Sequence, residues 1–177
     1  MQTLPALNPG QLYLLLAARP ARHELVNTLI ARLSAGGRLL VLDGGNCFQA
    51  HRIARLVRRT TPDLAIALNN IHVVRAFTCY QVVALLAETP ATSLPTLVLD
   101  LLTTFQDENI LLPERRRLLE ISLSHLRRLS RRAPTLVSVA QDRKGSLPGE
   151  LLHLLEERVD QIWQFESPLP AEPLRLL

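Results

Sequence analysis

The stretch RLLVLDGGNCFQAHRIARLVRR (residues 38–59) decides the fold class of this chain. It begins with a short, almost continuously apolar run, continues through a pair of glycines, and ends in an amphipathic segment rich in arginine. A short Leu- and Val-rich run without polar alternation is typical of a β-strand that is covered on both faces. Such a strand followed by a helix predicts a βαβ unit and a parallel sheet.

The same alternation of short apolar runs and longer amphipathic segments recurs along the whole chain, so we expect an α/β fold with a mostly parallel central sheet between two helical layers. The expected strands are residues 12–17, 38–43, 71–75, 96–100, 135–140 and 161–165. The expected helices are residues 23–34, 49–59, 79–88, 114–132 and 148–157. The helix at 114–132 is the clearest, because its leucines recur at intervals of three and four residues.

Length and composition predict one folded domain. A chain of 177 residues can bury one sizeable core, and 47% hydrophobic with only 4% aromatic residues means that Leu, Val, Ile and Ala build it. We expect a single core domain over residues 1–165, followed by a proline-containing tail over residues 166–177. The three prolines of that tail disfavour regular structure, and a tail of this kind is either a flexible end or a segment that docks on a partner.

The location of the protein is predicted from what its sequence lacks. No apolar run reaches the roughly 18 residues needed to cross a bilayer, and the opening MQTLPALNPG has no positively charged n-region of a signal peptide. We therefore expect a cytoplasmic protein that does not contact a membrane. Cys47 and Cys79 have no companion ligands at metal-binding spacing, so two reduced thiols and no metal site are expected.

A series of short motifs follows in a characteristic order between residues 38 and 108. They are a strand ending in Asp43, then Phe48, Arg52-Ile53, Asn70-Ile71, Arg75-Ala76 and a strand ending in Asp100. This order resembles the ATPase core of the RecA/RadA recombinase superfamily, particularly the archaeal RadA and eukaryotic Rad-type branch. The resemblance implies a three-layer RecA-like P-loop NTPase fold, in which Asp100 would be the Walker B aspartate and Gln141 the sensor glutamine after the fifth strand.

The chain departs from that family at the phosphate-binding loop. Where the family has GxxxxGK[ST], Ala17 and Arg22 stand at the glycine positions, His23 at the lysine and Glu24 at the Ser/Thr. A working loop needs glycines that let backbone N–H groups wrap the phosphates, a lysine for charge and a hydroxyl for Mg²⁺. We expect the carboxylate of Glu24 to point where the triphosphate would sit. In a second interpretation, Arg19 and Arg22 hold a lone phosphate or a nucleic-acid backbone at the start of the helix.

The catalytic position is also altered. The glutamate that the family carries two residues after the aspartate of the second strand aligns with Gly45, so no carboxylate is present to orient or deprotonate an attacking water. The two departures together predict a pseudo-ATPase with no catalytic residue and no cofactor. For Asp100, a solvated carboxylate at the end of the strand and a vestigial Mg²⁺ ligand both remain open. Gln141 has no γ-phosphate to sense and is expected to bond backbone groups.

Basic residues define the candidate nucleic-acid surface. In the resembled family, DNA lies along the loops after the fourth and fifth strands, which implies phosphate contacts from Arg115, Arg116, Arg117, Arg143 and Lys144. We expect Phe105, the only aromatic residue in these loops, to lie in the core beneath them. Further arginine blocks stand at residues 52–59 and 127–132. For these blocks, a solvated helix exterior and contact with a polyanion remain open.

The predicted function is that of a noncatalytic RecA-like accessory protein in DNA recombination or repair. It would act by assembly with a protein partner, with a recombinase-like subunit or with itself, and by contact with the DNA backbone. The alternative is an ATP-binding RecA-like ATPase, with ATP and Mg²⁺ as cofactors, whose loop is completed by Lys144 or by an arginine of a neighbouring subunit. A third interpretation is a regulatory or scaffold protein unrelated to DNA that keeps only the fold.

Overall fold

Six short strands form one central sheet in the computed structural model, which describes residues 6–141 and 149–165. Their order across the sheet is β3-β2-β4-β5-β1-β6, and every neighbouring pair is parallel. The strands are β1 (Leu12–Ala17), β2 (Leu39–Asp43), β3 (Ile71–Arg75), β4 (Thr96–Leu99), β5 (Thr135–Ala140) and β6 (Gln161–Phe165). β1, β4 and β5 are buried along their whole length, as their continuous apolar runs predict.

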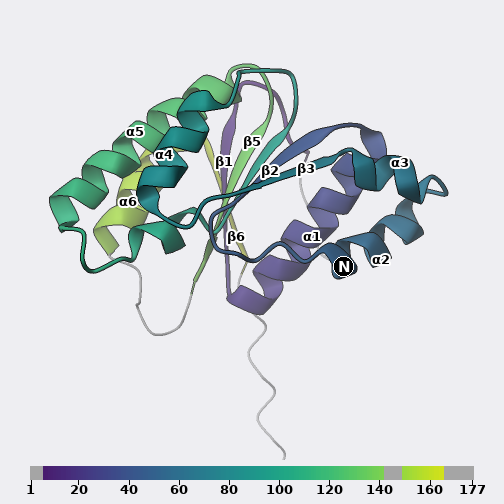
Figure 1. Cartoon of the computed structure of the whole chain (residues 1–177), viewed down its shortest axis with the longest axis horizontal. Helices are drawn as coiled ribbons and strands as arrows, with labels where there is room; N and C mark the ends of the chain where they lie inside the picture. Colours follow the sequence, from purple (N-terminus) through teal and green to yellow (C-terminus); the bar gives the residue numbers. More distant parts are fainter. Residues whose placement is uncertain (1–5, 142–148, 166–177) are drawn as a thin grey trace, which may run out of the picture.

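Helices cover both faces of this sheet, which confirms the predicted three-layer α/β fold and is consistent with a RecA-like arrangement (Figure 1). One face carries α1 (Arg19–Gly36), α2 (Ala50–Thr60) and α3 (Leu64–Asn69). The other carries α4 (Cys79–Glu88), the 3₁₀ helix η1 (Leu101–Phe105), α5 (Leu112–Ser130) and α6 (Gly149–Arg158). Successive residues of β1 point to opposite faces, so Tyr13 and Leu15 join the core under α1 while Leu14 and Leu16 join the core under α5.

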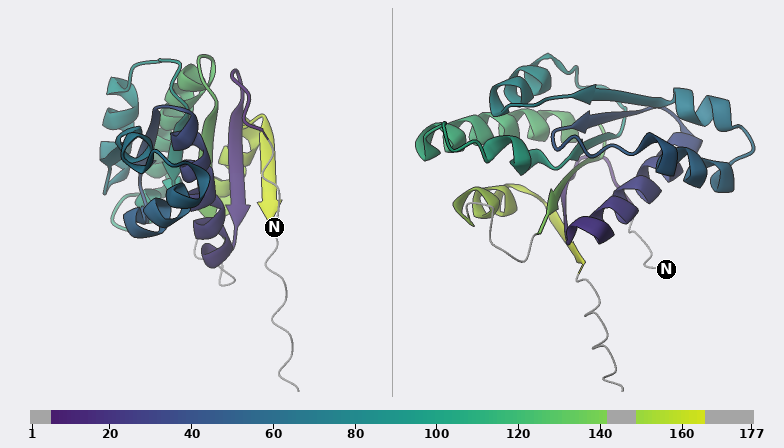
Figure 2. Two further views of the ribbon diagram at one scale, coloured as in Figure 1. Left: turned by 90° about the vertical axis from the view of Figure 1, so that its right-hand side faces the viewer. Right: turned by 60° about the horizontal axis from the view of Figure 1, so that its bottom comes forward.

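All carboxyl ends of the strands lie at one edge of the sheet because every pair is parallel; Figure 2 shows this for β1 and β6, which run side by side in the same direction. The connections after β2 and after β4 leave that edge on opposite sides, toward α2 and toward η1 with α5. In open α/β sheets a crevice forms where neighbouring connections diverge in this way, and ligands bind there. The fold therefore places the candidate site at the ends of β2 and β4.

The start of α1 differs from the prediction. The helix begins at Arg19 and not at His23, because Pro20 in its first turn has a backbone angle that suits a helix start. Only Ala18 separates it from β1, and the N–H of Arg22 donates to the carbonyl of Ala18 at 2.9 Å in the helical pattern. The residues that align with a phosphate-binding loop are therefore wound into the helix.

Two elements were not predicted, whereas the other boundaries agree within two residues. α3 has six residues, too few to display a helical period in the sequence. η1 follows Asp100, whose left-handed backbone (φ 53°) turns the chain at the end of β4. Within the described residues, no helix has the length and apolarity that crossing a membrane would require. The predicted tail, residues 166–177, lies outside the described residues.

Candidate functional site

A hollow of about 200 Å³ lies at the carboxyl edge of the sheet, where the connections after β2 and β4 diverge. Small-molecule sites usually enclose about 300 to 1,000 Å³, so this hollow is small for a nucleotide. Its walls come from the first turns of α1, the β2–α2 loop and the end of β4. The lining residues are Arg19, Arg22, His23, Gly45, Asn46, Cys47, Phe48, Gln49 and Asp100.

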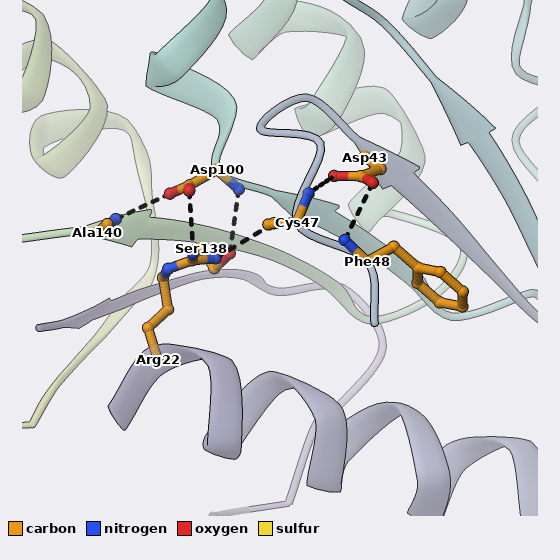
Figure 3. A network of polar contacts seen from close by, with 7 residues as sticks. All are labelled: Arg22, Asp43, Cys47, Phe48, Asp100, Ser138 and Ala140. Carbon is orange, nitrogen blue, oxygen red and sulfur yellow. Dashed lines mark hydrogen bonds and ion pairs between the residues drawn. The ribbon is translucent and has the colours of Figure 1, made fainter. Parts of the chain in front are cut away.

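The floor of the hollow is a buried ion pair between Arg22 and Asp100 (Figure 3). Nη2 of Arg22 lies 3.0 Å from Oδ2 of Asp100, and the two side chains are 1% and 7% exposed. Nη1 of Arg22 donates to Sγ of Cys47 at 3.5 Å, while Nε has no hydrogen-bond partner. A buried charge is tolerated only when an opposite charge and further hydrogen bonds accompany it. Each member of this pair is thus held in place by the other.

Asp100 is fixed from three directions. Its Oδ1 accepts a hydrogen bond from the N–H of Ala140 at 3.0 Å, and its own N–H donates to Oγ of Ser138 at 3.2 Å. Together with Arg22, these contacts connect α1, β4 and β5 across the site (Figure 3). Asp100 is therefore buried and is not a solvated carboxylate, one of the two interpretations that the sequence left open. Its carboxylate oxygens are already bound by a guanidinium and a backbone amide.

Gly45 closes the other side of this pair. A Cβ atom built on Gly45 would lie 2.4 Å from Cβ of Asp100 and 2.9 Å from its Oδ2. Contacts that short do not occur between real side chains, so any larger residue would have to displace Asp100. In this structure, packing against Asp100 excludes a larger side chain at Gly45, the position where the resemblance would place a catalytic glutamate.

Asp43 organises the loop that carries Gly45. Its carboxylate accepts hydrogen bonds from the N–H groups of Cys47 at 2.9 Å and Phe48 at 3.1 Å (Figure 3). Nε of Arg75 also lies 3.3 Å from Oδ2 of Asp43. The side chain of Asp43 has no exposed surface. The strand-end aspartate of the family motif therefore has a structural role here, since it holds residues 44–48 against the edge of the sheet.

The two titratable neighbours of the pair, His23 and Cys47, supply neither a positive charge nor a nucleophile at neutral pH. Burial lowers the pKa of His23, and Arg22 lowers it further, so the imidazole at the lysine position is neutral. Burial raises the pKa of the Cys47 thiol from 9.0 to about 11, against the opposing effect of its hydrogen bond with Arg22. Only the thiolate is a nucleophile, so Cys47 is inert near pH 7.

The remaining residues predicted for the phosphate loop and sensor lie around the hollow or outside it. Ala17 is buried at the end of β1, and its carbonyl accepts a hydrogen bond from the N–H of Gln141 at 2.9 Å. Arg19 is exposed and lines the hollow. Glu24 is exposed on α1 and does not line the hollow; the carboxylate that lines it belongs to Asp100. The reason is the early start of α1, which moves Glu24 into its second turn.

The predicted nucleic-acid residues Arg115, Arg116 and Arg117 lie in the first turns of α5 and not in a loop, and each has a partner within the chain. Arg115 donates to the carbonyl of Phe105 at 3.3 Å, and Arg116 pairs with Glu120 at 3.5 Å and with Glu150 at 2.8 Å. Arg117 makes two bonds of 2.7 Å to Glu114. Phe105 is fully buried, as expected of a core residue. Arg143 and Lys144 lie outside the described residues.

At the position where the resemblance would place Mg²⁺ and a triphosphate, Arg22 and Asp100 pair with each other. Within residues 6–141 and 149–165, no cluster of three His, Cys, Asp or Glu side chains is placed to bind a metal ion. Sequence reasoning missed the roles of Ser138 and Cys47, for which no motif gives a signal. Comparison with protein-family models and with curated proteins finds no match to this chain.

Proposed function

We propose that this protein is a noncatalytic RecA-like module, a pseudo-ATPase, which assists DNA recombination or repair by assembling with a protein partner or with another copy of itself. The motif order of residues 38–108 and the parallel three-layer fold support the relation to RecA-like proteins. The observation that carries the proposal is the buried Arg22–Asp100 pair at the end of β4.

This pair replaces a ligand in three respects. The guanidinium of Arg22 takes the position of a cation, the carboxylate of Asp100 supplies the negative charge, and Gly45 leaves room for both. A triphosphate would have to break the pair and leave the carboxylate of Asp100 unpaired beside the negative charges of the phosphates, which is costly in a buried position. A site with its own internal counter-charges stabilises the fold without nucleotide.

Assembly is supported by the open edge of the sheet at β3. Among the described residues this strand pairs only with β2, so its outer backbone groups are available to another strand. Apolar side chains are exposed beside it, with Val73 at 37%, Val74 at 38%, Phe77 at 67% and Tyr80 at 51%. Exposed apolar residues that gather along the open edge of a sheet are typical of a protein interface.

Nucleotide binding provides the first test. Thermal melting with millimolar Mg-ATP, Mg-ADP and AMP should leave the midpoint unchanged, because a ligand that binds the folded state must raise it. A raised midpoint that Lys144→Ala abolishes would instead support an ATPase whose loop is completed by this lysine. A raised midpoint that persists in Lys144→Ala would equally refute the pseudo-ATPase.

Assembly is tested with Phe77→Asp, which places a charge beside the open edge of β3. The matched control is Ile162→Asp, because Ile162 is 45% exposed but lies on β6, at the opposite edge of the sheet from β3. Sedimentation velocity over a range of concentrations and pull-down of partners should show an association that Phe77→Asp reduces and Ile162→Asp retains. Equal association of the two variants would remove β3 from the interface.

A further inference from the structure

The outer face of α2 carries a concentration of positive charge that the nucleotide-like site does not use. Arg52, Arg55, Arg58 and Arg59 are all exposed, whereas the opposite face of the helix buries Ile53 and Val57. No acidic residue occurs between positions 44 and 62. Among the described residues, none of these four arginines forms an ion pair with a carboxylate.

Several other arginines among the described residues are occupied. Arg116 and Arg117 pair with carboxylates, and Arg127 pairs with Asp160. Arg128 donates to the carbonyls of Leu86 and Thr89. Among the described helices, α2 therefore carries the largest group of arginines without a carboxylate partner.

The elements packed against α2 offset little of this charge. α1 and α3 contact it, and the only acidic residue on α1 is Glu24, while α3 has none and is preceded by Asp63. The field of α2 also reaches the hollow, because Arg52 and Arg19 both act to lower the pKa of His23. The basic surface thus continues from α2 toward the first turns of α1.

We infer that the outer face of α2 binds the phosphate backbone of a nucleic acid. Arginine suits this role, because its planar guanidinium donates two parallel hydrogen bonds to a phosphate. Arg52, Arg55 and Arg59 follow one another at intervals of three and four residues and therefore share one stripe of the helix. At a rise of about 1.5 Å per residue the stripe is about 10 Å long, a length over which a DNA duplex presents several phosphates.

The geometry favours nucleic acid over an anionic membrane. A helix that lies on a bilayer inserts its apolar face among the lipids. The buried residues of the apolar face of α2, Ile53 and Val57, already belong to the core under α1, so the charged face is the one that is available. The contact would be independent of base sequence, because a stripe of arginines binds the phosphate backbone and does not form hydrogen bonds to the base edges.

The test is fluorescence anisotropy of the full chain with fluorescein-labelled single-stranded and duplex DNA of 30 nucleotides, at several salt concentrations. The test variant is Arg55→Gln with Arg59→Gln. The control is Arg131→Gln with Arg132→Gln, which removes the same charge from exposed arginines at the end of α5, on the other face of the sheet. Arg52→Gln is a second, independent variant of the stripe. All four side chains are exposed, so both double variants should melt like the wild type.

The α2 double variant should weaken binding and reduce the slope of log K against log salt by about 2, at about 0.9 for each lost phosphate contact on duplex DNA. The control should keep the wild-type slope. An equal loss of DNA affinity in both double variants would mean that binding follows net charge alone and would overturn the inference. An absence of DNA binding by the wild type at 50 mM salt would also overturn it. Binding to phosphatidylserine vesicles that Arg55→Gln/Arg59→Gln abolishes, without DNA binding, would reassign the surface to membranes. This inference rests on the proposed function, yet the two fail separately, since a nucleotide-induced shift in melting concerns the hollow alone.

Discussion

Replacing Gly45 by alanine should destabilise the protein strongly although it adds only one methyl group. The new Cβ would lie 2.4 Å from Cβ of Asp100 and 2.9 Å from its Oδ2. Ordinary contacts between carbon atoms are about 3.5 to 4.0 Å, so Asp100 or the loop would have to move by roughly 1 Å. That movement would disturb the ion pair of Asp100 with Arg22 and its hydrogen bond from Ala140.

The cost follows from these contacts. Overpacking a well-filled interior costs about 1 to 3 kcal/mol, and breaking a buried ion pair outright costs about 3 to 5 kcal/mol. Since the pair is displaced and not deleted, we expect Gly45→Ala to lower the free energy of unfolding by about 3 kcal/mol. For a chain of this length that corresponds to a fall in melting temperature of about 6 to 12 °C.

The assay is urea unfolding followed by circular dichroism, with Gly36→Ala as the matched control. Gly36 ends α1, and nothing lies within 4 Å of a Cβ built there. Alanine at that position should be neutral or stabilising by about 0.5 to 1 kcal/mol, because it reduces the freedom of the unfolded chain. A loss below about 1 kcal/mol for Gly45→Ala would refute the claim that Asp100 fills the space of the catalytic glutamate.

Two further predictions concern the same site. Arg22→Met and Asp100→Asn should each lower the free energy of unfolding by about 3 kcal/mol, because each leaves the other charge buried and unpaired. The double variant should lose less than the sum of the two, because it leaves no unpaired charge. Additive losses in urea unfolding would contradict a direct pair. Cys47 should react with iodoacetamide about 100-fold more slowly at pH 8 than a thiol of pKa 9.0, because its pKa of about 11 leaves so little thiolate, and the rate should rise with pH up to about 11. Mass spectrometry of the labelled peptide measures this rate, and labelling at pH 8 as fast in the folded as in the urea-unfolded chain would show that folding does not raise the pKa of this thiol.

The fold could be predicted from the sequence because its signals are local. The Leu- and Val-rich strands are visible in the sequence as apolar runs, and the strand limits predicted from these runs agree with the structure within one residue. The start of α1 was misplaced because the alignment to a phosphate-binding loop suggested a loop where Pro20 begins a helix. α3 and η1 are too short to show a period.

The site could be predicted only in part, since its chemistry depends on contacts between distant residues. The sequence indicates that the loop lysine and the catalytic glutamate are absent, but not that Arg22 reaches Asp100 across the edge of the sheet. The pairing of Arg117 with Glu114 could have been read from their spacing of three residues, which stabilises helices. The pairing of Arg116 with Glu150 of α6 could not be predicted in this way, because only the packing of α5 against α6 brings the two residues together.

The measurement that tests the central claim most directly is isothermal titration of the wild type and of Gly45→Ala with Mg-ATP, accompanied by thermal melting. The internal Arg22–Asp100 pair predicts no binding heat and no shift in midpoint for the wild type at millimolar nucleotide. A saturable heat at one nucleotide per chain, with a raised midpoint, would show that the pair opens for a ligand and would contradict the proposal that this protein is a pseudo-ATPase.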